Sequence, residues 1–104
     1  MGTREVNYEE WADEAKRLFG DDPMDWRFEC PVCGYRARVR DWKDVGAISG
    51  EAGFSCLGRH LPEEQRDPEN GGPCDYAGGG LFRLNPVIVH CDGTTVEMFE
   101  FAKN

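Results

Sequence analysis

The sequence lacks long apolar runs and has few of the side chains that build a large core. Apolar residues make up 39% of its 104 positions, and its mean hydropathy is −0.64. No segment is long enough to cross a bilayer, and residues 1–10 lack the apolar stretch of a signal peptide. We therefore expect one cytoplasmic domain over residues 1–104, without membrane contact. Its small hydrophobic core is expected to need further stabilisation, by disulfides or by a metal ion.

Basic residues are also scarce. Twelve Lys and Arg stand against 20 Asp and Glu, which gives a formal net charge of −8. An acidic surface repels phosphate backbones at long range, so this balance disfavours extensive nucleic-acid binding.

The chain shows no catalytic constellation. No Ser/His/Asp or Cys/His set stands out. The glycines at 78–80 are not followed by the Lys-Ser/Thr pair and helix that a phosphate loop requires. We therefore predict that the protein is not an enzyme.

The cysteines carry the strongest signal. Five is an odd number, which fits poorly with a fully paired disulfide framework. Cys30 and Cys33 form a C-x-x-C turn closed by Gly34, and two thiolates in such a turn can grip one metal ion. Cys56 and Cys74 can complete a tetrahedral set. We predict one structural Zn²⁺ held by these four residues, with iron as the alternative metal.

Two other interpretations of the cysteines stay open. Seventeen residues separate Cys56 from Cys74, so His60 competes for the fourth position. We favour Cys74, because glycine-rich turns flank it, whereas His60 begins a long polar segment. Cys30 and Cys33 also resemble the dithiol pair of an oxidoreductase. Such a pair is usually followed by a helix, and a strand pattern follows here.

Local patterns predict a small α+β fold. Asn7 and Glu10 form a capping-box pattern before an apolar stripe at helical spacing, which indicates a helix over residues 8–19. Strands on both sides of the C-x-x-C turn predict a zinc-ribbon-like core over about residues 26–84. An Asp-Gly turn between two β-rich runs predicts an antiparallel hairpin over residues 87–101.

Residues 35–40 alternate with period two, as in a half-buried strand. Asp41 is then expected to cap a short helical turn. Three arginines on one strand face, bordered by rings, form a possible surface for single-stranded nucleic acid. This surface consists of Tyr35, Arg36, Arg38, Arg40 and Trp42. For so acidic a chain we favour the alternative, in which the arginines pair with carboxylates such as Glu29 and Asp41.

The segment Leu57–Pro73, called the 57–73 loop below, is rich in charge and proline. We expect an exposed loop pinned at its ends by Cys56 and Cys74, and loops of this length are often functional. The favoured function is therefore binding of a protein partner, with Arg59 and His60 as polar contacts. After this loop, residues 81–82 are expected to return to the core.

A set of spaced motifs resembles a known family. These motifs are Asp21–Phe28, Cys30–Gly34, Phe54–Arg59, Cys74–Tyr76, Gly79–Phe82 and Phe99–Ala102. They resemble small uncharacterised proteins encoded by bacteriophages, prophages and other mobile elements of bacteria, the VVA-type hypothetical family. The resemblance spans nearly the whole chain. It implies that the cysteines at 30, 33, 56 and 74 are the family's set, and it implies no biochemical activity.

Overall fold

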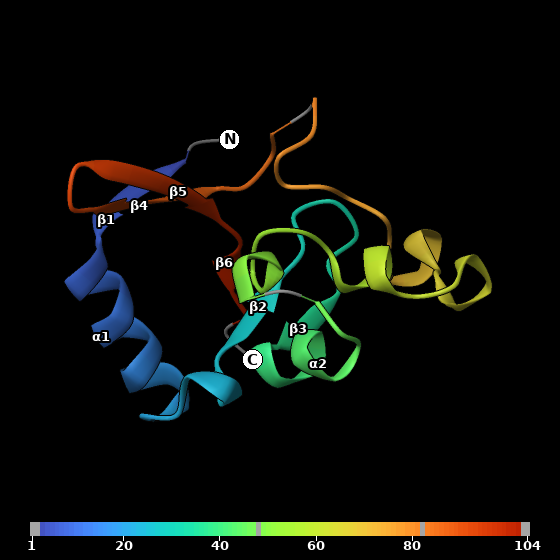
Figure 1. The fold of residues 1–104 in the computed structure, drawn as a ribbon, viewed down its shortest axis with the longest axis horizontal. Coiled ribbons are helices and arrows are strands. Elements are labelled where there is room, and N and C mark those ends of the chain that lie inside the picture. The colour runs from blue at the N-terminus through green and yellow to red at the C-terminus, as the bar shows by residue number, and fades with distance from the viewer. Residues whose placement is uncertain (1–2, 48, 82, 103–104) are drawn as a thin grey trace.

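The computed structural model describes residues 3–47, 49–81 and 83–102. The helices and strands are β1 (Arg4–Asn7), α1 (Tyr8–Phe19), β2 (Arg27–Glu29), β3 (Arg36–Arg38), α2 (Val39–Asp44), β4 (Val87–Cys91), β5 (Thr94–Met98) and β6 (Glu100–Phe101). The connections contain short 3₁₀ turns (Figure 1). None of the described helices is long and apolar enough to span a bilayer.

The strands form two three-stranded sheets, ordered β1-β4-β5 and β3-β2-β6. The chain passes directly from β5 into β6, so one C-terminal segment joins both sheets (Figure 1). All pairings are antiparallel except that of β1 with β4, which is parallel. The predicted α+β fold with an N-terminal helix and antiparallel hairpins is confirmed, whereas β1 was not predicted.

Helix α1 begins at the predicted capping box. The Asn7 side chain accepts a hydrogen bond from the Glu10 N–H at 2.8 Å, and the Glu10 carboxylate accepts one from the Asn7 N–H at 3.3 Å. These two bonds satisfy N–H groups that have no partner within the helix. The helix buries Trp11, Ala12 and Ala15 against the rest of the fold.

An aromatic cluster holds the elements together. Trp11 of α1 stacks on Phe28 of β2 and Phe101 of β6, with ring centroids 6.2 and 5.6 Å apart. Phe28 in turn meets Trp42 of α2 edge-on. Each such ring pair adds about 0.5–1.5 kcal/mol beyond simple burial. This cluster fixes sheet β3-β2-β6, which carries the C-x-x-C turn.

The chain after the C-x-x-C turn differs from the prediction. The strand ends at Arg38 and α2 begins at Val39, so Arg40 lies on a helix and not on the strand. Asp41 is the third residue of this helix, and its carboxylate accepts the Arg38 N–H at 2.9 Å. The prediction that Asp41 precedes the helix as its cap is therefore wrong.

Residues 57–73 are more tightly held than their composition suggests. Leu57 and Gly58 are buried, and the Arg66 side chain donates to the carbonyl oxygens of Gly58 at 2.7 Å and Leu61 at 3.2 Å. Beyond this loop Leu81 is 90% exposed, so its predicted return to the core is wrong. Phe82 lies outside the described residues.

Candidate metal centre

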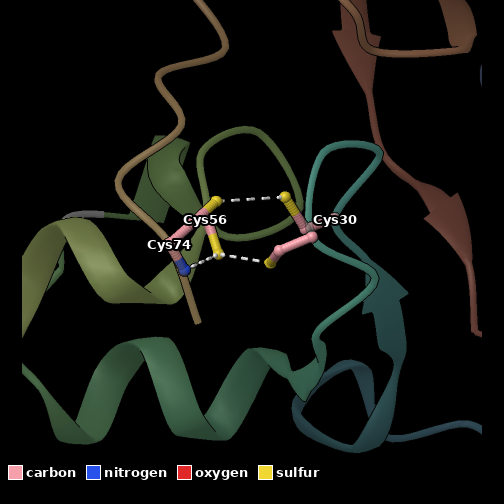
Figure 2. A group of neighbouring side chains, drawn as sticks. Cys30, Cys56 and Cys74 are labelled. Atoms are coloured by element: carbon pink, nitrogen blue, oxygen red, sulfur yellow. Dashed lines mark hydrogen bonds between the residues drawn. The ribbon is translucent and has the colours of Figure 1, made fainter. Parts of the chain in front are cut away.

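Four cysteines from three separate segments converge on one point. Cys30 and Cys33 lie in the turn between β2 and β3, Cys56 precedes the 3₁₀ turn Leu57–His60, and Cys74 follows the 57–73 loop. Figure 2 shows Cys30 facing Cys56 and Cys74 across the centre. All four Sγ atoms lie within 4.8 Å of one another.

The sulfur spacing fits a tetrahedral metal ion. The Sγ atoms of Cys30 and Cys74 are 3.8 Å apart, as are those of Cys33 and Cys56. In a tetrahedral centre with metal–sulfur bonds of ~2.3 Å, the sulfur atoms are ~3.8 Å apart. A set of four thiolates is also the donor set that zinc and iron prefer. The residues present therefore fit the predicted ion.

The β2–β3 turn has the local geometry that aims two sulfurs at one point. The Gly34 N–H donates to the Cys30 carbonyl oxygen, and the Cys30 N–H donates to the Tyr35 carbonyl oxygen, both at 2.9 Å. Gly34 has a φ of +81°, in the left-handed region that favours glycine. This turn could be predicted from the sequence, because all of its hydrogen-bonding partners lie within residues 30–35.

Backbone N–H groups support three of the four sulfurs. The Val32 N–H donates to Cys30 Sγ at 3.4 Å, and the Cys74 N–H donates to Cys56 Sγ at 3.3 Å. Backbone N–H groups of Gly58 and Tyr76 also donate to Cys56 and Cys74 respectively, and each of these bonds favours the thiolate form of its cysteine. Such donors stabilise thiolates and orient metal ligands.

The thiols also perturb one another. Hydrogen bonding with Cys56, together with burial, raises the pKa of Cys30 well above its ordinary value. Hydrogen bonding from Cys30 lowers the pKa of Cys56 to about 5, and burial raises that of Cys74 to about 12. The ionisation of one thiol is therefore tied to the protonation of its neighbours. Ionising the whole set in this buried position requires a cation at its centre.

Two glycines allow the segments to approach closely. Sequence reasoning noted the glycine-rich turns beside Cys74 but predicted this role for neither glycine. A Cβ at Gly58 would collide with the carbonyl oxygen of Cys74 and lie 2.9 Å from its nitrogen. A Cβ at Gly72 would lie 2.5 Å from Cys33 Sγ. Their only sequence signal is that each lies within two residues of a cysteine ligand, Cys56 or Cys74.

His60 does not join the cluster, whereas Cys74 does. The His60 Nε2 atom is buried and lies 3.4 Å from a carboxylate oxygen of Glu51, and the residue as a whole is half-buried rather than fully solvated. Cys91 lies on β4, outside the cluster. The five cysteines form no disulfide, so Cys30 and Cys33 share the centre with two further thiols instead of facing each other as an isolated pair.

The proposed nucleic-acid surface is not assembled. Trp42 is 2% exposed and its indole N–H donates to the Ser55 carbonyl oxygen, so its expected place beside the arginines is wrong. Tyr35 is half-buried. Ion pairs join Arg36 to Glu29 at 2.8 Å, Arg38 to Asp41 at 3.3 Å and Arg40 to Asp25 at 2.8 Å. Pairing with carboxylates was the alternative that we favoured. Arg59 is exposed on the 57–73 loop.

The fold and the centre together define a small α+β protein with a four-cysteine cluster that can hold a metal ion. The chain belongs to the VVA0879-like family, whose model matches residues 7–102. This family is uncharacterised, so membership brings no activity with it. No curated protein and no solved structure matches the chain.

Proposed function

We propose that this protein is a non-catalytic binding module, stabilised by one zinc ion, that acts by binding another protein. The observation that carries the proposal is the closed set of four thiols. Three of these cysteines are buried, and four protein ligands fill a tetrahedral shell. Such a centre leaves no open position for a substrate or a reactive water, which is the arrangement of a structural site.

Zinc is the metal we propose, because a structural ion must hold the chain together without redox chemistry. Zn²⁺ has one oxidation state and no geometric preference of its own, so it follows the tetrahedron that the protein offers. A reducing compartment such as the cytoplasm keeps the thiols available for it.

The 57–73 loop is the surface that we propose for the partner. Both of its ends adjoin cysteines of the centre, so metal binding would fix its position. It extends away from both sheets as the yellow segment of Figure 1. Its exposed residues include Arg59 and several acidic side chains, namely Glu63, Glu64, Asp67 and Glu69. A charged, exposed surface of this kind suits a basic patch on a partner protein. The resemblance to proteins of phages and mobile elements makes a host protein the partner we would seek first.

Two other functions have less support. Single-stranded nucleic acid would need cations and stacking rings, but Trp42 is buried and the arginines at 36, 38 and 40 each contact a carboxylate. A dithiol oxidoreductase would need an isolated reactive pair, whereas Cys30 and Cys33 share their position with two more thiols.

The proposal is tested with two charge-matched variants of the zinc-loaded protein, used as bait in a host lysate. The loop variant is Glu63→Gln, Glu64→Gln and Glu69→Gln. The control, which changes exposed acids elsewhere, is Asp13→Asn, Asp21→Asn and Asp92→Asn. We expect the loop variant to keep its zinc and lose the captured protein, and the control to keep both. Retention of the same protein by both variants, at equal strength, would contradict a role for the loop.

A further inference from the structure

The outer face of the β2–β3 hairpin carries a concentration of positive charge on an otherwise acidic protein. Phe28 and Ala37 point inward from this hairpin and are 1% and 3% exposed. Because side chains alternate along a strand, the arginines on either side of these two residues lie on the outer face. They are Arg27 on β2 and Arg36 and Arg38 on β3.

The register of the hairpin contains an unfavourable pair. Arg27 lies directly opposite Arg38, whereas the next pair on the same face of the hairpin is Glu29 with Arg36. Like charges directly opposite one another destabilise a sheet, and opposite charges stabilise it. On its other side Arg27 accepts a backbone hydrogen bond from Ala102, a residue without charge. Folding alone therefore gives no reason for a cation at position 27.

The Arg27 side chain also has no ion-pair partner among the described residues. It is exposed and forms no ion pair with any residue in the described ranges 3–47, 49–81 and 83–102. The contacts of the other two arginines are single ones: Arg36 donates to Glu29 through Nε, and Arg38 donates to Asp41 through one terminal nitrogen. Most N–H donors of these guanidinium groups are left for an incoming acceptor.

The three arginines line a common hollow. A cavity of about 320 Å³ is bounded by Arg27, Arg36, Ala37, Arg38 and Asp41. Guanidinium groups are planar forks that match a carboxylate with two parallel hydrogen bonds. We propose that this hollow, called the arginine pocket below, binds a carboxylate group on an acidic segment of a protein partner. This inference rests on the proposed function and adds a second contact surface to it.

Two observations favour an acidic protein segment over nucleic acid. The net charge of −8 repels a long polyanion more strongly than a short segment that carries one or two carboxylates, and Asp41 in the lining would repel each further negative charge. Among the described residues, no aromatic side chain lines the pocket, so nucleic-acid bases would have no ring to stack on there. A short segment with one or two carboxylates meets less of this repulsion and needs no ring to stack on.

The hairpin that carries the arginine pocket is also held rigidly in the fold. Its two strands are joined by the turn that carries Cys30 and Cys33, so a bound metal would lock one end of the hairpin. Phe28 anchors the opposite face in the aromatic cluster. Because the backbone of the hairpin is fixed in this way, only the arginine side chains have to become ordered when a ligand binds.

The test measures binding of a fluorescent oligoglutamate peptide to the zinc-loaded full chain at low salt, by fluorescence anisotropy. The key variant is Arg27→Gln, and Arg17→Gln on the exposed side of α1 removes the same charge elsewhere. We expect Arg27→Gln to weaken binding about threefold to fivefold, and Arg17→Gln to leave it close to wild type. The melting temperature of Arg27→Gln should equal or exceed that of the wild type, because the variant removes a like-charge pair.

Three results would overturn the inference. They are absence of oligoglutamate binding, equal weakening by both variants, and tighter Arg27-dependent binding of oligothymidylate than of oligoglutamate. The last would assign the pocket to nucleic acid instead. Zinc content is measured on each sample. A protein that holds zinc but does not bind oligoglutamate refutes only the proposal of the arginine pocket. A protein without zinc refutes the proposed function instead.

Discussion

Replacing Gly58 with alanine tests whether the close packing around the centre matters for metal binding. A methyl group there would collide with the Cys74 carbonyl oxygen and lie 2.8 and 2.9 Å from the carbonyl carbon and nitrogen of that residue. Restoring an ordinary 3.4 Å contact with the nitrogen alone requires a shift of about half an ångström in one of the two backbone segments, and relieving the closer contact with the oxygen requires more. Metal–ligand distances tolerate only about 0.2 Å.

The shift would separate Cys56 from Cys74 and weaken the N–H donor that Gly58 provides to Cys56. Loss of comparable support around metal ligands lowers affinity about tenfold to hundredfold, which corresponds to about 1.4–2.8 kcal/mol. Competition with a chromogenic chelator measures the zinc affinity directly. Gly50→Ala is the matched control, because a Cβ at Gly50 meets nothing within 4 Å. Equal zinc affinity in the two variants would refute the reasoning.

Three further predictions concern the ligands and their protons. Cys74→Ser should lose the zinc, whereas Cys91→Ser should keep it, because Cys91 lies outside the cluster; elemental analysis of the purified variants decides this. His60→Ala should also keep the zinc, and loss of metal from it would reopen the choice of the fourth ligand. Hydrogen bonding with Cys56 raises the pKa of Cys30 and burial raises that of Cys74, so zinc must displace protons that these thiols hold at neutral pH. Zinc affinity should therefore rise with pH and fall on acidification, and an affinity that does not change between about pH 8 and 6 would contradict this linkage.

Features set by nearby residues could be read from the sequence. The Asn7–Glu10 capping box and the apolar stripe defined helix α1, and the C-x-x-C turn with Gly34 defined the two-sulfur turn. In both cases the hydrogen-bonding partners lie within five residues of each other. The local pattern and the folded geometry then express the same constraint.

Features set by distant residues could not be read in this way. Strand β1 pairs with β4, more than eighty residues away, and its four residues carry no strong strand pattern. Trp42 follows an arginine-rich run and was assigned to the surface, yet its indole reaches the buried Ser55 carbonyl oxygen. The glycines at 58 and 72 matter because of atoms that only folding brings near them. Each of these features depends on packing between distant parts of the chain, and no local sequence pattern indicates such packing.

The metal content of the purified protein tests the central claim most directly. Elemental analysis of protein made in a zinc-supplemented host should find one zinc per chain, and a strong chelator should remove it and melt the region around Cys30, Cys33, Cys56 and Cys74 together. The serine variant at Cys74 provides the metal-free reference for the melting curve. Protein that folds stably without stoichiometric zinc, or a disulfide between Cys30 and Cys33 in the folded protein, would contradict the account.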